Sequence, residues 1–199
     1  MNINLFAFLS FVFVTTFTPG PNNISSTSMG VLHGFKKTWP YRLGIATGFF
    51  FVMLLCGAIS GTLQRIFPTF ETVLHYAGAV YILWLAYETL RTTYTFKEGD
   101  QTLLGFSRGL LLQILNPKVV VYGLTLYSTF LLSVTHNVFY TMLSALFLAS
   151  MSLCSTSTWA LFGSAIRHYL HYPTVRRVVN ATLALLLVYT AIELSGLIG

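Results

Sequence analysis

Charged residues are scarce in this chain of 199 residues: they make up 8% of it, and only five of them are acidic. Soluble domains carry roughly 25% charged residues, which keep their surface in water. A chain that is 55% hydrophobic, with a mean hydropathy of +0.72, has too few charges to coat an apolar core. The composition therefore excludes a soluble globular domain and predicts a protein that crosses a membrane several times.

Cysteine is nearly absent as well. Cys56 and Cys154 each lie in an apolar stretch and belong to no CxxC pair or Cys/His cluster, so we predict no metal site and no cofactor. The chain has no glycine-rich phosphate loop, HExxH or GxSxG motif, which is weak support for a protein that is not an enzyme. No basic run exceeds two residues, so the net charge of +6 belongs to the loops and predicts no nucleic-acid partner.

Six apolar segments are long enough to cross a bilayer, for which about 20 residues are needed. The expected spans are residues 3–30, 43–63, 72–90, 109–132, 138–162 and 178–198. The first has no basic residues before it, so we read it as a retained helix and not as a signal peptide. A polar stretch, 91–108, divides the spans into two sets of three. We therefore predict an all-α membrane protein with one domain, 1–199, in halves of about 1–95 and 105–199.

Basic residues are concentrated in alternate loops. Three loops hold three each, nine of the eleven in total: Lys36, Lys37 and Arg42; Arg91, Lys97 and Arg108; Arg167, Arg176 and Arg177. The positive-inside rule places these loops in the cytoplasm and both termini outside. Because three is an odd number of spans, the halves then have opposite orientations. We predict six transmembrane helices that form two inverted three-helix repeats.

The first span is interrupted by Thr18-Pro19-Gly20-Pro21-Asn22-Asn23. Proline removes an amide donor, and an unpaired backbone carbonyl is costly in hydrocarbon, so such a break is tolerated only inside protein or beside a wet cavity. We expect Thr18 to cap a new half-helix, with Pro19 or Pro21 in its first position. The free N–H groups at its start would suit an anion, such as the carboxylate of an amino acid. The alternative is a proline kink without a ligand.

The fourth span has a comparable interruption, at Asn116, Pro117 and Lys118. Pro117 follows Pro21 by 96 residues (117 − 21), and matched breaks in two halves are typical of a transporter's binding site at mid-membrane. Lys118 lies ten residues after Arg108, about 15 Å along a helix and so near the centre of a hydrocarbon core about 30 Å thick. A lysine at that depth needs a partner, such as a bound substrate; the alternative is that it snorkels to the surface.

The fifth span carries six hydroxyl residues between Ser150 and Thr158. They line a polar path or, as small residues commonly do, simply allow helices to pack closely. Trp159 follows them, and we interpret it as an interfacial anchor.

These motifs resemble the LysE/RhtB family of bacterial amino-acid exporters. The matching stretches are 18–22, His33-Gly34, Ala77-Gly78-Ala79 with Tyr81 and Trp84-Leu85, and Asn116-Pro117-Lys118. Three further stretches, 21–24, 52–56 and 126–130, resemble the family's cysteine/O-acetylserine exporter branch. The resemblance implies export of small amino acids across the bacterial inner membrane, driven by the proton gradient.

We therefore expect a secondary transporter whose partners are a small neutral amino acid, the lipid bilayer and a coupling proton. Its expected substrate-binding residues are Thr18, Pro19, Gly20, Pro21, Asn22, Asn23, Gln113, Asn116, Pro117 and Lys118. The helix ends and Lys118 would hold the carboxylate; asparagine and backbone oxygens would hold the amino group. Two rival interpretations are a thiol-redox electron carrier that uses Cys56 and Cys154, and a metal-ion exporter, which the shortage of carboxylates and thiols disfavours.

Overall fold

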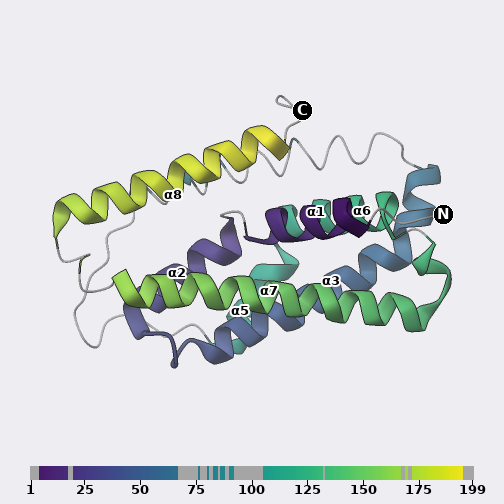
Figure 1. The fold of residues 1–199 in the computed structure, drawn as a ribbon, viewed down its shortest axis with the longest axis horizontal. Coiled ribbons are helices and arrows are strands. Elements are labelled where there is room, and N and C mark those ends of the chain that lie inside the picture. The colour runs from purple at the N-terminus through teal and green to yellow at the C-terminus, as the bar shows by residue number, and fades with distance from the viewer. Residues whose placement is uncertain are drawn as a thin grey trace.

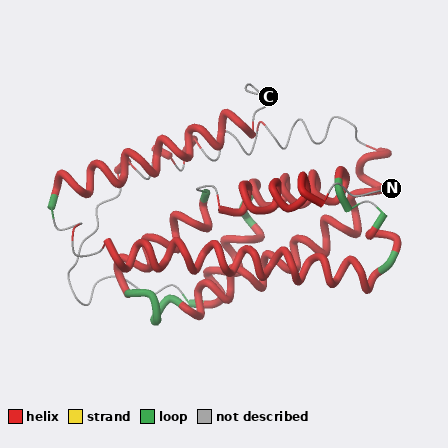
Figure 2. Tube along the Cα trace, in the orientation of Figure 1, coloured by secondary structure: helices red, strands yellow, loops and turns green. Residues whose placement is uncertain are grey.

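The computed structural model describes residues 5–17, 20–66, 105–131, 133–166 and 172–194, with single positions at 76, 80, 83, 84, 86, 87, 90, 91 and 169. In these residues the chain is all-helical and has no strands, as predicted (Figures 1 and 2). The helices are α1 (Leu5–Phe17), α2 (Pro21–His33), α3 (Trp39–Ile66), α5 (Phe106–Ile114), α6 (Pro117–Thr129), the 3-10 helix η1 (Val134–His136), α7 (Val138–Ile166) and α8 (Pro173–Leu194).

Two of the described helices are long and apolar enough to cross a membrane, namely α3 over Trp39–Ser60 and α7 over its whole length. The pair α5 and α6 makes a third span when it is counted as one helix bent by 61°. The chain thus breaks where Pro21 and Pro117 predicted it would. The expected third span, 72–90, lies outside the described residues apart from single positions, so the six-span inverted repeat stays a prediction.

Three helices begin earlier in the chain than the apolar runs suggested. α5 starts at Phe106 and not at Gly109. α3 starts at Trp39 and not at Leu43, and α8 starts at Pro173 and not at Val178. α3 and α8 each have a proline in the first turn, Pro40 and Pro173, where the missing amide hydrogen costs nothing. The earlier starts correct four loop assignments, because Arg42 lies inside α3, Arg108 inside α5, and Arg176 and Arg177 inside α8. Of these, Arg42 is buried.

α7 presents small residues to the protein and large ones to its surroundings. Its buried positions recur every three or four residues and are mostly Ala, Ser, Thr and Gly, from Thr141 to Gly163. Its exposed positions include large apolar side chains such as Phe139, Leu143 and Leu146. Small inward residues let neighbouring backbones approach closely, and large apolar residues on the other face suit lipid.

Glycines bring two helix pairs into backbone contact. Between α2 and α7, a Cβ atom on Gly30 would overlap the backbone of Ala160, and one on Gly163 would overlap the backbone of Thr27. α5 lies on α3 in the same way, with contacts of Gly44 against Phe106 and of Gly109 against Tyr41. Each half of the sequence therefore packs one half-helix on a long helix of the other half.

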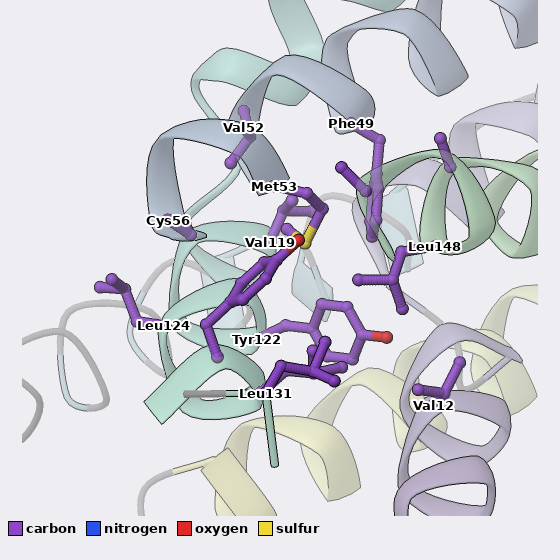
Figure 3. Close-up of a cluster of buried hydrophobic side chains, with 14 of the residues drawn as sticks. Val12, Phe49, Val52, Met53, Cys56, Val119, Tyr122, Leu124, Leu131 and Leu148 are labelled. Carbon is purple, nitrogen blue, oxygen red and sulfur yellow. The ribbon is translucent and has the colours of Figure 1, made fainter. Parts of the chain in front are cut away.

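The main apolar cluster joins α1, α3, α6 and α7. Figure 3 shows Phe49 of α3, Tyr122 of α6 and Leu148 of α7 converging, with Val12 of α1 at the edge. Phe11 of α1 stacks on the ring of Tyr122, with 5.7 Å between ring centroids. This cluster forms one wall of the region in which the two helix breaks meet.

Candidate functional site

The two helix breaks face one another. The side-chain amide of Asn116 donates to Oδ1 of Asn22 over 3.0 Å, although 94 residues separate them. Asn22 follows Pro21, the first residue of α2, and Asn116 precedes Pro117, the first residue of α6. The N-terminal ends of α2 and α6 are thus joined directly, as the matched interruptions in the sequence suggested.

A cavity lies at this junction, with an empty volume of about 390 Å³ of which part is open to the surroundings. Six of the expected binding residues line it: Gly20, Pro21, Asn22, Asn23, Asn116 and Lys118. Gln113 and Pro117 are not in the lining, and Thr18 and Pro19 lie outside the described residues. The lining is completed by Thr15, Thr16, Phe49, Val119, Tyr122 and Ser152.

The carbonyl groups at the end of α1 are taken up by side chains. The carbonyl of Thr16 accepts from Nδ2 of Asn23 at 2.9 Å and from Oγ of Ser155 at 2.9 Å. The carbonyl of Phe17 accepts from Nε1 of Trp159 at 3.2 Å. A helix end leaves its last carbonyls without intrahelical partners, and in a membrane protein they need protein partners. The carbonyls of Thr16 and Phe17, which precede the break, are therefore satisfied by protein donors.

Two of these partners, Ser155 and Trp159, were missed as site residues. The hydroxyl run was assigned to packing or to a polar path, and Trp159 to the interface. The signal that could have found them is their spacing: Ser152, Ser155 and Trp159 are three and four residues apart, so they share one face of α7. Ser152 lines the cavity on that face.

The starts of α2 and α6 are capped differently. Gly20 is the N-cap of α2 and makes no side-chain cap, with Pro21 in the first helical position. The expectation that Thr18 caps this helix was wrong, because the helix starts at the second proline and Thr18 falls two residues before its cap. In α6, by contrast, Oδ1 of Asn116 accepts from the backbone N–H of Lys118 at 3.1 Å. The first amides of α2 thus lack the side-chain cap that α6 has.

The side chain of Lys118 crosses from α6 to the start of α2. A Cβ atom built on Gly20 would lie 3.1 Å from Nζ of Lys118 and 3.1 Å from its Cδ. The ammonium group therefore sits beside the N-cap of α2, in the wall of the cavity. Gly20 has an extended backbone, with φ −168°, so it is the space for Lys118 and not the backbone conformation that calls for glycine here.

The helices around the cavity contain no acidic residue in their sequences. The sequence contains no aspartate or glutamate between residues 1 and 70 or between 101 and 192. α1, α2, α3, α5, α6 and α7 all fall within these ranges. The cavity therefore combines the cation of Lys118 with two helix N-termini, each of which carries a partial positive charge. This arrangement favours an anionic group.

The remaining candidate residues lie apart from the cavity. Gln113 is fully buried on α5 against Gly48, and neither atom of its side-chain amide has a hydrogen-bond partner among the described residues. Cys56 is buried and Cys154 is exposed, and both are free thiols. In the part of the chain that the structure describes, no three His, Cys, Asp or Glu side chains gather in a way that could hold a metal ion.

Apolar helices long enough to cross a membrane, together with helix starts that meet at a polar cavity, are typical of a membrane transporter. The family model for LysE type translocators matches residues 13–196 of the chain. The chain therefore belongs to this family, as the resemblance of its sequence motifs suggested. It is a transporter and not an enzyme.

Curated relatives extend the match over nearly the whole chain. The cysteine/O-acetylserine efflux protein of Escherichia coli O1:K1 is 37% identical over 191 residues, which is 96% of each chain. The protein of the same name from Shigella flexneri serotype 5b (strain 8401) is 37% identical over 193 residues, 96% of this chain and 97% of the relative. No solved structure matches the chain significantly.

Proposed function

We propose that this protein exports small neutral amino acids of the cysteine and O-acetylserine type from the cytoplasm across the bacterial inner membrane. The efflux proteins of that name are similar to it along 96% of its length. Proteins of one transporter family differ in their substrates, so the proposal needs support from the chemistry of the cavity.

The observation that carries the proposal is the pair of opposite helix ends at the first break. α1 ends at the cavity with Thr15 and Thr16 in its last turn, and α2 begins there with Gly20 and Pro21. A helix C-terminus carries a partial negative charge and an N-terminus a partial positive one. An α-amino acid carries both an ammonium and a carboxylate group, so it matches the two ends at once.

The carboxylate would lie at the start of α2, between its uncapped amides and Lys118. The ammonium group would lie toward the last turn of α1, where Thr15 and Thr16 line the cavity and the helix end carries a partial negative charge. The position of the Lys118 ammonium beside Gly20 supports substrate binding over snorkelling, because the side chain follows the cavity wall. Asn22 and Asn116 would hold the two helix starts at the spacing that one substrate requires.

The lining of the cavity is mixed, with an apolar part beside the polar groups of the two helix breaks, as is usual for small-molecule sites. Phe49, Val119 and Tyr122 supply the apolar part of the lining, against which a short side chain would lie.

The orientation follows from the basic loops. The loop between α2 and α3, with Lys36 and Lys37, and η1, which precedes α7, lie at opposite ends of the molecule (Figure 1). We propose that the first of these ends faces the cytoplasm and that both termini are outside.

We also propose proton coupling. No carboxylate of α1 to α7 in the described ranges can carry that proton, because their sequences contain none.

Efflux from proteoliposomes tests the function. Vesicles preloaded with L-cysteine or O-acetyl-L-serine should release it faster with the protein than without, and a pH gradient across the membrane should change the rate. The cysteine methyl ester, which lacks the carboxylate, and N-acetyl-L-cysteine, which lacks the ammonium group, should be poor substrates. Equal release of the ester and the free acid would contradict the proposed carboxylate site.

A further inference from the structure

A second cation is buried near the start of α3, away from the cavity lining. Arg42 of α3 is only 1% exposed. Its guanidinium donates to Oγ of Ser157 on α7 at 2.7 Å and to the carbonyl of Phe35 at 2.9 Å. It also lies over the ring of Phe35, 4.1 Å from the centroid. Among the described residues its Nε has no hydrogen-bond partner.

All the partners of Arg42 among the described residues are neutral. A buried charge that is not compensated by an opposite one is unfavourable, even when it is hydrogen-bonded. A neutral donor would bind Ser157 and Phe35 as well without that cost. No acidic residue occurs in the sequence before Glu71 or between Asp100 and Glu193, so the helices that form this bridge contain no carboxylate. The positive charge of Arg42 is therefore not explained by its contacts within the protein and points to a function.

Arg42 and Ser157 lie on the same two helices that wall the cavity. Phe49 and Ser152 line the cavity on α3 and α7. Arg42 is seven residues from Phe49, two turns of helix or about 10 Å, on the same face of α3. Ser157 is five residues from Ser152, about 7.5 Å along α7. The Arg42–Ser157 hydrogen bond therefore joins α3 to α7 on the side of the cavity that faces the loop with Lys36 and Lys37.

We propose that Arg42 is a second carboxylate-binding residue, at the entrance from the basic-loop side. There a substrate's carboxylate replaces the hydroxyl of Ser157 on the guanidinium before the substrate moves on to Lys118. This inference rests on the proposed function. It adds a second carboxylate site, at Arg42, before the one at Lys118. A carboxylate accepts two parallel N–H bonds from a guanidinium, whereas a hydroxyl accepts one, so the exchange is favourable. When no substrate is present, the hydrogen bond from Arg42 to Ser157 holds α3 and α7 together at this entrance.

Alkylation of a thiol at position 157 tests this site without any assumption about the transported substrate. Ser157→Cys is introduced together with Cys154→Ser, which removes the exposed thiol and leaves only the buried Cys56. The rates with iodoacetate, which carries a carboxylate, and with neutral iodoacetamide are measured, and their ratio is taken. Changes in access or thiol reactivity affect both reagents, so the ratio isolates attraction of the carboxylate.

Adding Arg42→Gln should lower the iodoacetate-to-iodoacetamide ratio roughly tenfold, the size of one charge-assisted contact. Arg42→Lys keeps the charge but not the planar fork of the guanidinium. Its ratio should lie between those of the proteins with Arg42 and with Arg42→Gln. A thiol placed at His136, which is exposed in η1, should show no change in ratio with Arg42→Gln. If Arg42→Gln does not fold, acetate should still protect position 157 from iodoacetamide in the protein that keeps Arg42, and acetamide should not. An unchanged ratio, or equal protection, would overturn the proposal.

Transport measured from each side separates this inference from the proposed function. In oriented proteoliposomes, Arg42→Gln should raise KM for L-cysteine roughly tenfold when the substrate is supplied at the basic-loop side. KM from the other side should not change. If Arg42 had only a structural role, Arg42→Gln would change KM for L-cysteine equally from both sides. If the wild-type protein carries no L-cysteine, the proposed function fails, while the alkylation ratio still decides the role of Arg42.

Discussion

Asn116 donates to Asn22 over 3.0 Å and so ties together the two helix starts that the prolines create. The same Asn116 caps α6 through the N–H of Lys118. One side chain thus fixes the start of α6 and positions it against the start of α2. Its two contacts have different consequences, because a cap stabilises a helix wherever it occurs, whereas the cross-link matters only if the geometry of the cavity matters.

We predict that Asn22→Ala and Asn116→Ser reduce efflux by a similar factor, roughly tenfold or more. Asn22→Ala removes the cross-link and leaves the cap of α6 in place, and Asn116→Ser keeps a capping hydroxyl but is too short to reach Asn22. Asn116→Ala loses both contacts and should in addition be less stable by about 1 kcal/mol. Efflux rates and thermal unfolding of the purified variants check this. Wild-type efflux by Asn22→Ala would show that the cross-link has no functional role.

Gly20→Ala should weaken substrate binding by displacing Lys118, because the added methyl would lie 3.1 Å from its Nζ. Gly105→Ala is the matched control. Gly105 is also an N-cap glycine with an extended backbone and no side-chain cap, but a Cβ atom there meets nothing within 4 Å. Both variants lose the same capping residue, so a difference in L-cysteine affinity between them reports the position of Lys118. Equal affinities would mean that the ammonium position is not critical.

The sequence predicted the breaks and six of the residues that line the cavity, and the limits of that prediction have physical causes. Proline positions are local and fix where a helix must stop, so the breaks near Pro21 and Pro117 were predicted correctly. The cap at Gly20 was missed because two prolines competed and the choice between them depends on packing. Ser155, Trp159 and Arg42 were missed because their partners lie more than 100 residues away or in a loop. Such contacts depend on how α7 and α3 pack, which a single sequence does not reveal.

Lys118→Met should lower the affinity for L-cysteine roughly ten- to a hundredfold, because it removes the charge and keeps the length of the side chain. Lys118→Arg should also impair binding, since a planar fork replaces a compact ammonium beside Gly20. Binding to the purified protein checks both variants. A snorkelling lysine predicts the reverse pattern, in which Arg is tolerated and Met is nearly neutral.

The proposed orientation predicts opposite labelling of two exposed loop positions, Lys37 and His136. With Cys154→Ser as background, a thiol introduced by Lys37→Cys should be shielded from an impermeant external reagent in intact cells. One introduced by His136→Cys should react. Permeabilised cells serve as the control in which both react. External labelling at position 37, with none at 136, would invert the topology and place the Arg42 entrance outside.

Gln113→Met should make the protein more stable and less active. The buried amide of Gln113 has no hydrogen-bond partner among the described residues, and a buried polar group without one costs about 1–3 kcal/mol. Methionine has a similar length and no such cost, so unfolding should require more heat. A group kept at the expense of stability points to function, and Gln113 precedes Asn116, whose N–H donates to its carbonyl at 3.2 Å.

If Gln113 serves transport, efflux by Gln113→Met should fall roughly tenfold or more while stability rises. Leu112→Met is the control, because this neighbour on α5 packs against the apolar cluster of Met29, Tyr41 and Ile45. The control exchanges one apolar side chain for another of similar volume, so both stability and efflux should stay close to wild type. Thermal unfolding and efflux are measured on the same preparations. Wild-type efflux by a stabilised Gln113→Met would remove Gln113 from the substrate path and leave its buried amide without a role in transport.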